Sequence, residues 1–298
     1  MESFTLVDAN YLVNRSVHKG LNLKTSFGLV TGGVLLFLKS LWYFKDLGKP
    51  ILVFDGGKAE FRKKLFPGYK IREKNESLSK IFEFTFGTLQ DIVPKMGFPV
   101  IRIVGSEADD VIYILAKELR SNFKITVVSE DEDFFQTLKL DIEVFLPRKD
   151  ETWTRELFVK KWGFEPEYFS IWKALIGDTS DKIPGVPSLG IRKNKDLKNK
   201  FLVASYIINH LNSPSLEALF DFTEHDQIAG QKIRDYFSLI KRNYLLVDLE
   251  HTDVTSDVVL KSLREASCLA SPDYNYIHEV FKKLEFSSLG KWLTYLSL

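Results

Sequence analysis

One stretch of the sequence reads Pro99-Val100-Ile101-Arg102-Ile103-Val104-Gly105-Ser106-Glu107-Ala108-Asp109-Asp110-Val111-Ile112-Tyr113-Ile114-Leu115-Ala116. Its first part predicts a buried strand, and its last part predicts a helix. Three carboxylates, Glu107, Asp109 and Asp110, lie on the turn between them, beside the positive end of the helix dipole. Taken alone, this turn permits two interpretations. Its acids either cap the helix, as acids often do, or bind a cation.

The same order of apolar run and acidic end recurs along the first half of the chain. The run at 4–7 ends in Asp8, and the run at 50–54 ends in Asp55. The run at 124–128 is followed by Asp131 and Asp133. Strands that alternate with helical stretches indicate an α/β fold with a central, mainly parallel sheet flanked by helices. The predicted strands are 4–7, 50–54, 99–104, 124–128 and 141–146, with helices at 27–44, 76–95 and 111–116.

The pattern becomes helical after Thr154, and we place a domain boundary near Gly177. This boundary divides the chain into a domain at 1–176 and a helical subdomain at 177–298. The helices predicted after Thr154 are 155–162, 166–176, 197–211, 215–220, 227–241 and 272–298, with a short strand at 245–249.

Composition narrows the class of protein. The chain has 298 residues, of which 45% are hydrophobic and 27% charged, which is typical of a soluble globular protein. The net charge of +1 means that any anionic partner must be held by local patches. The single cysteine, Cys268, allows no internal disulfide. The N-terminus lacks the layout of a signal peptide, and Lys39 interrupts the most apolar run, so we expect a cytoplasmic protein without a membrane partner.

The acidic residues that follow the strands are predicted to converge. The carboxyl ends of parallel strands meet at one edge of a sheet, where sites form. A further pair, Asp178 and Asp181, follows in Gly177-Asp178-Thr179-Ser180-Asp181. No His/Cys cluster lies nearby, and hard oxygen ligands favour Mg²⁺ or Mn²⁺ over zinc. Two such ions are the usual device for displacement at phosphorus.

Basic stretches at 58–74 and 182–200 follow an acidic strand end and the acidic pair, respectively. A solvated face is the usual meaning of a charge run. Here each basic stretch directly follows predicted metal ligands, so its lysine and arginine side chains would lie beside the metal ions and hold phosphate. The second stretch contains a turn at 185–190, whose free amides could hold a phosphate before a helix.

Taken together, these motifs resemble the 5′-nuclease family, which includes the 5′→3′ exonuclease domain of bacterial DNA polymerase I and the stand-alone bacteriophage flap endonucleases. The matches cover most of the chain in the family's order. They are Val7-Asp8 with Arg15 and His18, Phe54-Asp55-Gly56, Phe61-Arg62, Tyr69-Lys70 with Arg72, Glu107-Ala108-Asp109-Asp110, Ser129 to Asp133, Gly177 to Asp181, Ile183 to Val186, and Phe281 to Phe286.

The resemblance implies a PIN-like domain with a helical arch at about 58–95, and a helix–three-turn–helix element in the C-terminal subdomain. It also implies two Mg²⁺ or Mn²⁺ ions, and a K⁺ ion at the helix–three-turn–helix turn. The first divalent ion would be served by Asp8, Asp55, Glu107, Asp109 and Asp110, and the second by Asp131, Asp133, Asp178 and Asp181. The implied catalytic residues are Lys70, Arg72 and Asp8. The implied DNA contacts are Arg15, His18, Arg62, Tyr69, Lys70, Arg72, Gly185, Gly190, Arg192, Lys193 and Lys195.

The implied activity is that of a structure-specific 5′ nuclease which cuts 5′ flaps, nicks or RNA primers in replication and repair. Its partners would be branched, nicked or flapped DNA or an RNA–DNA hybrid, and replication proteins. We expect a free-standing monomer in a bacterial or phage-infected cell. The sequence departs from the family at Ala9 and Ser188, where glycine is usual, and between Lys70 and Arg72, where one residue is missing.

Three other functions compete with this prediction. An aspartate-dependent phosphatase would need a second acid two positions after Asp8, and Asn10 stands there. A DNA-binding protein with a decayed site is disfavoured, because every matched acid is present. A related PIN-type nuclease that acts on RNA stays open.

Overall fold

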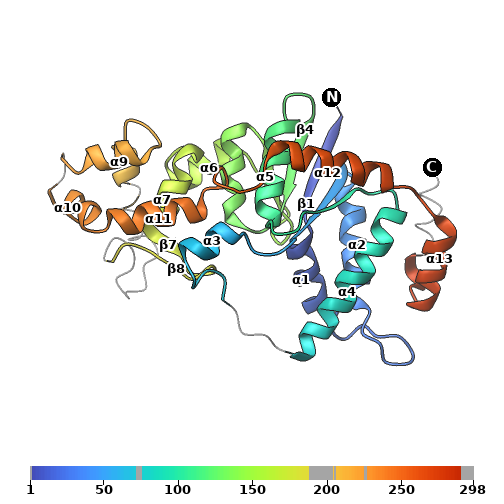
Figure 1. Ribbon diagram of the computed structural model, residues 1–298. Helices are drawn as coiled ribbons and strands as arrows, with labels where there is room; N and C mark the ends of the chain where they lie inside the picture. Colours follow the sequence, from blue (N-terminus) through green and yellow to red (C-terminus); the bar gives the residue numbers. More distant parts are fainter. Residues whose placement is uncertain (1, 72–75, 188–203, 205, 225–226, 290–298) are drawn as a thin grey trace.

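The computed structural model describes residues 2–71, 76–187, 204, 206–224 and 227–289. Its centre is a six-stranded sheet in the order β3-β2-β1-β4-β5-β6 (Figure 1). The strand pairs among β1 to β5 are parallel, and β6 runs antiparallel to β5. The predicted mainly parallel sheet is therefore confirmed. Its strands are β1 (Ser3–Asp8), β2 (Lys49–Phe54), β3 (Val100–Arg102), β4 (Lys124–Val128), β5 (Glu143–Leu146) and β6 (Glu151–Trp153).

The central strands are apolar on both faces because helices cover both sides of the sheet. Successive side chains of a strand point to opposite faces. On β1, Leu6 packs into one hydrophobic core and Val7 into the other. On β2, Ile51 and Leu52 divide in the same way. This continuous burial holds the strand ends in fixed register.

One face of the sheet is covered by α1 (Ala9–Gly20), α2 (Gly32–Phe44), α4 (Glu76–Lys95) and α13 (Tyr274–Lys283). Helix α1 crosses α2 where Gly20 faces Gly32. A Cβ atom built on Gly32 would lie 2.1 Å from the carbonyl oxygen of Gly20, so no larger residue fits this crossing. This close packing joins the last turn of α1 to the first turn of α2.

The other face is covered by α5 (Ala108–Leu119), the 3₁₀ helix η1 (Glu132–Leu140) and α12 (Ser256–Leu269). The same hydrophobic core continues beyond them into α6 (Arg155–Trp162), η2 (Pro166–Tyr168), α7 (Phe169–Ile176) and α11 (Phe237–Val247). Helix α12 packs on α5 and β3, and α13 packs on α4. The chain after residue 177 therefore returns to both faces of the sheet. The division into domains at 1–176 and 177–298 stays a prediction, and one hydrophobic core crosses that boundary.

The remaining elements extend the molecule away from the sheet. Figure 1 shows α9 and α10 at one end of an elongated molecule and α13 at the other. The short strands β7 and β8 form a separate antiparallel pair close to α3. These elements are α3 (Glu60–Leu65), β7 (Gly177–Asp178), β8 (Ile183–Pro184), α9 (Leu216–Phe222), α10 (Gln227–Asp235) and η3 (Ser287–Leu289).

Several predicted boundaries differ from the structure. The strand predicted at 245–249 is wrong, because α11 continues to Val247. The helix predicted at 227–241 is two helices, and the one predicted at 27–44 begins at Gly32. Helices α1 and α12 were not predicted, although α1 buries Leu12, Val13 and Val17 at helical spacing. Of the helix predicted at 197–211, the described residues 204 and 206–209 are helical.

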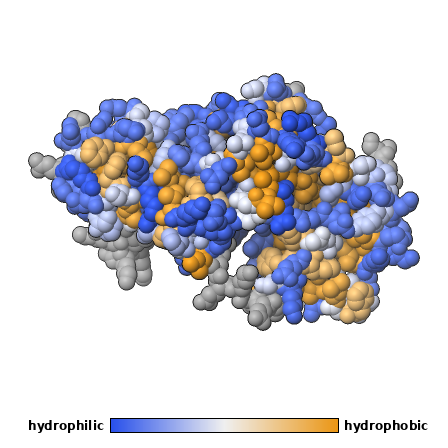
Figure 2. Space-filling view, in the orientation of Figure 1, coloured by the Kyte–Doolittle hydropathy of each residue, from blue (hydrophilic) through white to orange (hydrophobic). Residues whose placement is uncertain are grey.

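No helix among the described residues is long and apolar enough to cross a membrane. Figure 2 shows that apolar residues form separate patches on the face of the molecule that is seen in Figure 1.

Candidate active site

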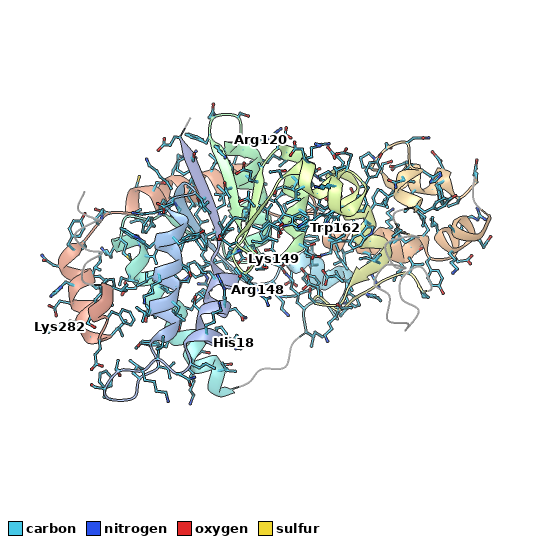
Figure 3. The ribbon with its side chains drawn as sticks, turned by 180° about the vertical axis from the view of Figure 1, so that it is seen from behind. His18, Arg120, Arg148, Lys149, Trp162 and Lys282 are labelled. Carbon is cyan, nitrogen blue, oxygen red and sulfur yellow. The ribbon has the colours of Figure 1, made fainter. Side chains whose placement is uncertain are left out.

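Carboxylates from several strand ends line one cavity of about 1000 Å³ at the carboxyl edge of the sheet. The predicted convergence therefore takes place. The cavity is also lined by the cationic side chains of Lys70 and Arg15 and by the imidazole of His18. Arg148, which sequence reasoning did not single out, lines it from the turn between β5 and β6; Figure 3 labels it together with His18. The carboxylates that line the cavity near the strand ends are those of Asp8, Asp55, Glu107, Asp109 and Asp131.

Asp8 is held by its place at the junction of β1 and α1. One of its oxygens accepts a hydrogen bond from the backbone amide of Tyr11 at 2.9 Å, and thereby caps α1. The other accepts from the hydroxyl of Ser129 at 2.9 Å, which lies just after β4. The carboxylate of Asp8 thus caps α1 and also lines the cavity.

Asp55 is oriented by Asn10. The Asn10 side chain donates to one oxygen of Asp55 at 2.8 Å and accepts from the Asp55 amide at 2.9 Å. The other oxygen of Asp55 accepts from the backbone amide of Ala108, at the start of α5, at 2.8 Å. Sequence reasoning considered Asn10 only as a missing acid, whereas the structure assigns it the positioning of Asp55.

Lys70 inserts its ammonium among the acids of the cavity. Its Nζ lies 2.8 Å from Glu107 Oε2, 3.7 Å from Asp109 Oδ2 and 3.7 Å from Asp181 Oδ2. Its backbone amide donates to the carbonyl of Asp181 at 3.1 Å, which fixes this segment against the turn after β7. Lys70 therefore joins the first group of acids to a second one.

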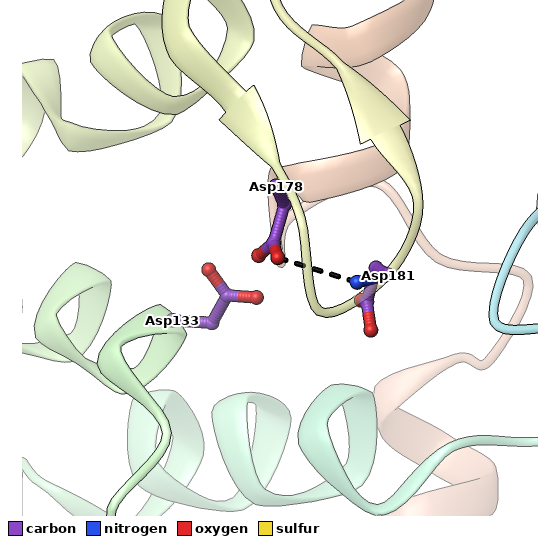
Figure 4. Close-up of side chains that lie close together, drawn as sticks. All are labelled: Asp133, Asp178 and Asp181. Atoms are coloured by element: carbon purple, nitrogen blue, oxygen red, sulfur yellow. Dashed lines mark hydrogen bonds between the residues drawn. The ribbon is translucent and has the colours of Figure 1, made fainter. Parts of the chain in front are cut away.

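The second group consists of Asp133, Asp178 and Asp181, which offer oxygens that all lie within 4.8 Å of one another. Figure 4 shows Asp133 approaching the turn that carries the other two, where the amide of Asp181 donates to Asp178 at 3.3 Å. The buried ammonium of Lys173 contacts both Asp133 and Asp178. Sequence reasoning missed Lys173, although a lone charge in the apolar helix Phe169–Ile176 was a visible signal.

The pKa values indicate that these acids are short of positive charge. Burial, together with the charge of the nearby Asp55, raises the pKa of Asp8 to about 7. Burial also raises the pKa of Asp133 to about 7, and the pKa of Asp109 well above its usual range. Burial likewise opposes ionisation of Asp178, but Lys173 overcomes this and lowers its pKa to about 2. Clustered oxygens that resist ionisation are a suitable donor set for a hard divalent cation.

Two predicted DNA contacts, those of Arg62 and Tyr69, are contradicted by burial. Arg62 is 2% exposed and forms a bidentate ion pair with Asp110, with N···O distances of 2.8 and 2.7 Å. Both oxygens of Asp110 are used in this pair and Asp110 is not among the residues that line the cavity, so its service to a metal ion, directly or through water, stays a prediction. Arg62 is too deeply buried to reach DNA. Tyr69 is 3% exposed and donates to Glu107 at 2.9 Å, so the prediction that it contacts DNA is wrong.

The remaining predicted residues divide by position. Gly185 packs so closely on α7 that a Cβ atom there would lie 2.1 Å from the carbonyl oxygen of Ile176, and its contact with DNA stays a prediction. The predicted K⁺ site on the turn at 185–190 extends beyond the described residues. Also outside them are Arg72, Gly190, Arg192, Lys193 and Lys195.

The Arg62–Asp110 pair leads to a prediction about stability. Arg62→Met should lower the free energy of unfolding by about 3–5 kcal/mol, because it leaves a buried carboxylate without its partner. It also removes the bond from Arg62 Nε to the carbonyl of Leu246, which joins α3 to α11. Urea unfolding followed by circular dichroism measures the change.

The matched control is Lys63→Met. Lys63 neighbours Arg62, but it is exposed and forms only a surface pair with Glu60 at 3.5 Å. Its removal should change the free energy of unfolding by no more than about 0.5 kcal/mol. Equal effects of the two substitutions would show that the buried pair has no special importance.

Comparisons with known proteins show the family of this chain and the relatives of its fold. The family model described as "5′-3′ exonuclease, N-terminal resolvase-like domain" matches residues 3–163. A 5′-3′ exonuclease of Buchnera aphidicola is 32% identical over 211 residues, which cover 69% of this chain and 73% of that protein. A 5′-3′ exonuclease of Aquifex aeolicus is 25% identical, with 98% and 95% covered. A bacteriophage T5 flap endonuclease, solved with DNA and metal ions, has a similar fold, with a TM-score of 0.70, 21% identity, and 90% and 99% covered.

Proposed function

Since the chain belongs to the 5′–3′ exonuclease family, we propose that it hydrolyses phosphodiester bonds at 5′ flaps, nicks and RNA primers of DNA by means of two divalent metal ions. Membership makes the chain a 5′ nuclease, and the proposal concerns its ions, its substrate and its residues. The observation that carries it is the cavity in which carboxylates from separate strand ends surround the ammonium of Lys70.

The acids suit two ions. The first would be held by Asp8, Asp55, Glu107 and Asp109, and the second by Asp133, Asp178 and Asp181 with Asp131 between the groups. Mg²⁺ or Mn²⁺ fits such oxygen donors. When bound, the ions supply charge that stabilises the attacking and leaving oxygens at phosphorus.

The chain's own cations would hold the substrate. Lys70 lies where it could donate to a phosphate oxygen whose charge increases in the transition state. Arg15 and His18 line the same cavity from α1 and would contact the DNA backbone. A contact of Arg72 with the scissile phosphate is proposed from the family resemblance alone.

A smaller hollow of about 290 Å³ continues from the cavity between α1 and α2. Arg15 and Lys19 line both spaces, Lys39 lines only the hollow, and none of the residues that line it is acidic. A phosphate backbone binds such basic surfaces without regard to sequence. The hollow therefore supports a path for nucleic acid away from the cavity, and with it the proposal that the partner is branched DNA.

A cleavage assay tests the proposed function. With Mg²⁺, the protein should cut a 5′-flap and a nicked duplex faster than intact duplex. EDTA should abolish cleavage, because the carboxylates without metal ions cannot stabilise negative charge on the phosphate oxygens. The panel should also include an RNA–DNA hybrid and a single-stranded RNA hairpin. Activity confined to the RNA hairpin would favour an RNA nuclease. Inertness on every substrate with Mg²⁺ and Mn²⁺ would contradict the proposal.

A further inference from the structure

The second group of acids contains a cation that belongs to the protein itself. Lys173 lies in the middle of α7, and the residue is 6% exposed. Its Nζ contacts Asp133 Oδ1 and lies 2.6 Å from Asp178 Oδ2. These are two of the three acids whose oxygens converge within 4.8 Å.

An ammonium and a divalent ion compete for the same carboxylate oxygens. Lys173 leaves the group of Asp133, Asp178 and Asp181 with a net charge of −2 instead of −3 when all are ionised. Like charges a few ångströms apart repel strongly in a partly buried site, so the ammonium also opposes the approach of a second cation. Both effects weaken metal binding at this group.

Lys173 differs from Lys70 in how it is held. Lys70 lies at the end of a segment after the short helix α3, and its side chain is 21% exposed. The side chain of Lys173 is 8% exposed, and its helix α7 buries Phe169, Ile171 and Leu175 in the hydrophobic core. The ammonium of Lys173 therefore stays close to Asp133 and Asp178. A bound ion could displace it by a small distance, but it would remain beside the site.

We propose that Lys173 is an internal competitor of the second divalent ion, and that it keeps the affinity of Asp133, Asp178 and Asp181 for this ion low in the absence of DNA. The inference rests on the proposed function, because it assumes that these acids bind the second ion. A group without Lys173 would bind its ion tightly whether or not a substrate phosphate was present.

Titration calorimetry with Mn²⁺ on DNA-free protein tests this. Wild-type protein should bind one ion tightly and a second at least about tenfold more weakly. Lys173→Met should lower the dissociation constant of the second site by about tenfold or more. The increase in melting temperature on adding Mn²⁺ should also be larger for this variant than for wild-type protein. The control Lys160→Met removes an exposed charge from α6 and should change neither value.

A purely structural role of Lys173 predicts the opposite direction. If Lys173→Met keeps a native circular dichroism spectrum and binds the second ion equally or less tightly, the proposal is overturned. If neither protein binds any Mn²⁺, the metal centre of the proposed function fails as well. Tight binding of one ion with an unchanged second site overturns only the role of Lys173.

A second measurement covers the case in which Lys173→Met does not fold. Wild-type protein labelled with ¹⁵N at lysine Nζ is titrated with Mg²⁺, and Lys173→Arg, which keeps the charge, assigns the buried ammonium signal. The signal of Lys173 should shift over the concentration range that fills the weaker site. A signal that stays unchanged when both sites are filled overturns the proposal.

Discussion

Lys70→Met is expected to lower the maximal rate of flap cleavage by about 10²–10³-fold, while the dissociation constant for DNA rises less than about threefold. In the proposed function Lys70 would be one donor among several contacts to the phosphate backbone, so its loss should matter little for binding. It is also held next to the acids, 2.8 Å from Glu107, where charge on a reacting phosphate would be greatest. Single-turnover cleavage and fluorescence anisotropy separate the two effects.

Lys19→Met is the control for Lys70. Lys19 lines the same cavity and is exposed, and no ion pair holds it within the described part of the chain. Its loss should weaken DNA binding and reduce its salt dependence, with the maximal rate nearly unchanged. If Lys70→Met instead changed rate and affinity to the same extent, Lys70 would be only an anchor for the backbone.

Asp109→Asn is expected to lower the rate of cleavage by at least about 10³-fold, because a bound metal ion contributes several kcal/mol of transition-state stabilisation. Asp109 lines the cavity, and Lys70 is a cationic partner at 3.7 Å. The amide is nearly isosteric but offers no charge. DNA affinity without metal should stay equal or increase, because one negative charge near the phosphates is gone.

Glu83→Gln provides the comparison for Asp109. Glu83 lines the cavity from α4 but is exposed and stands apart from the clustered acids. It should cleave at close to the wild-type rate. A DNA-binding protein with a decayed site would give another pattern. Asp109→Asn would alter the affinity for DNA, and neither the wild-type protein nor any variant would cleave.

The fold was largely predictable from local patterns. Apolar runs that end in acids specified β1, β2 and β4, because a strand buried on both faces must be apolar along its whole length. They also specified that the acids would meet, because parallel strands present their carboxyl ends at one edge. Helix α12 and the true end of α11 were not predicted, since short apolar runs occur equally in strands and in buried helices.

The sequence by itself determined that acids from several strand ends converge. Asp8, Asp55, Glu107 and Asp109 needed only the order of strands and turns to be placed in one cavity. Tertiary structure alone decided the partners of the remaining charges. Arg62 lies 48 positions from Asp110, and Lys173 lies 40 positions from Asp133, yet each pair is in contact. Pairing in the core depends on how the helices pack against one another. The sequence alone does not distinguish a lysine or arginine at the surface from one that is buried against an acid.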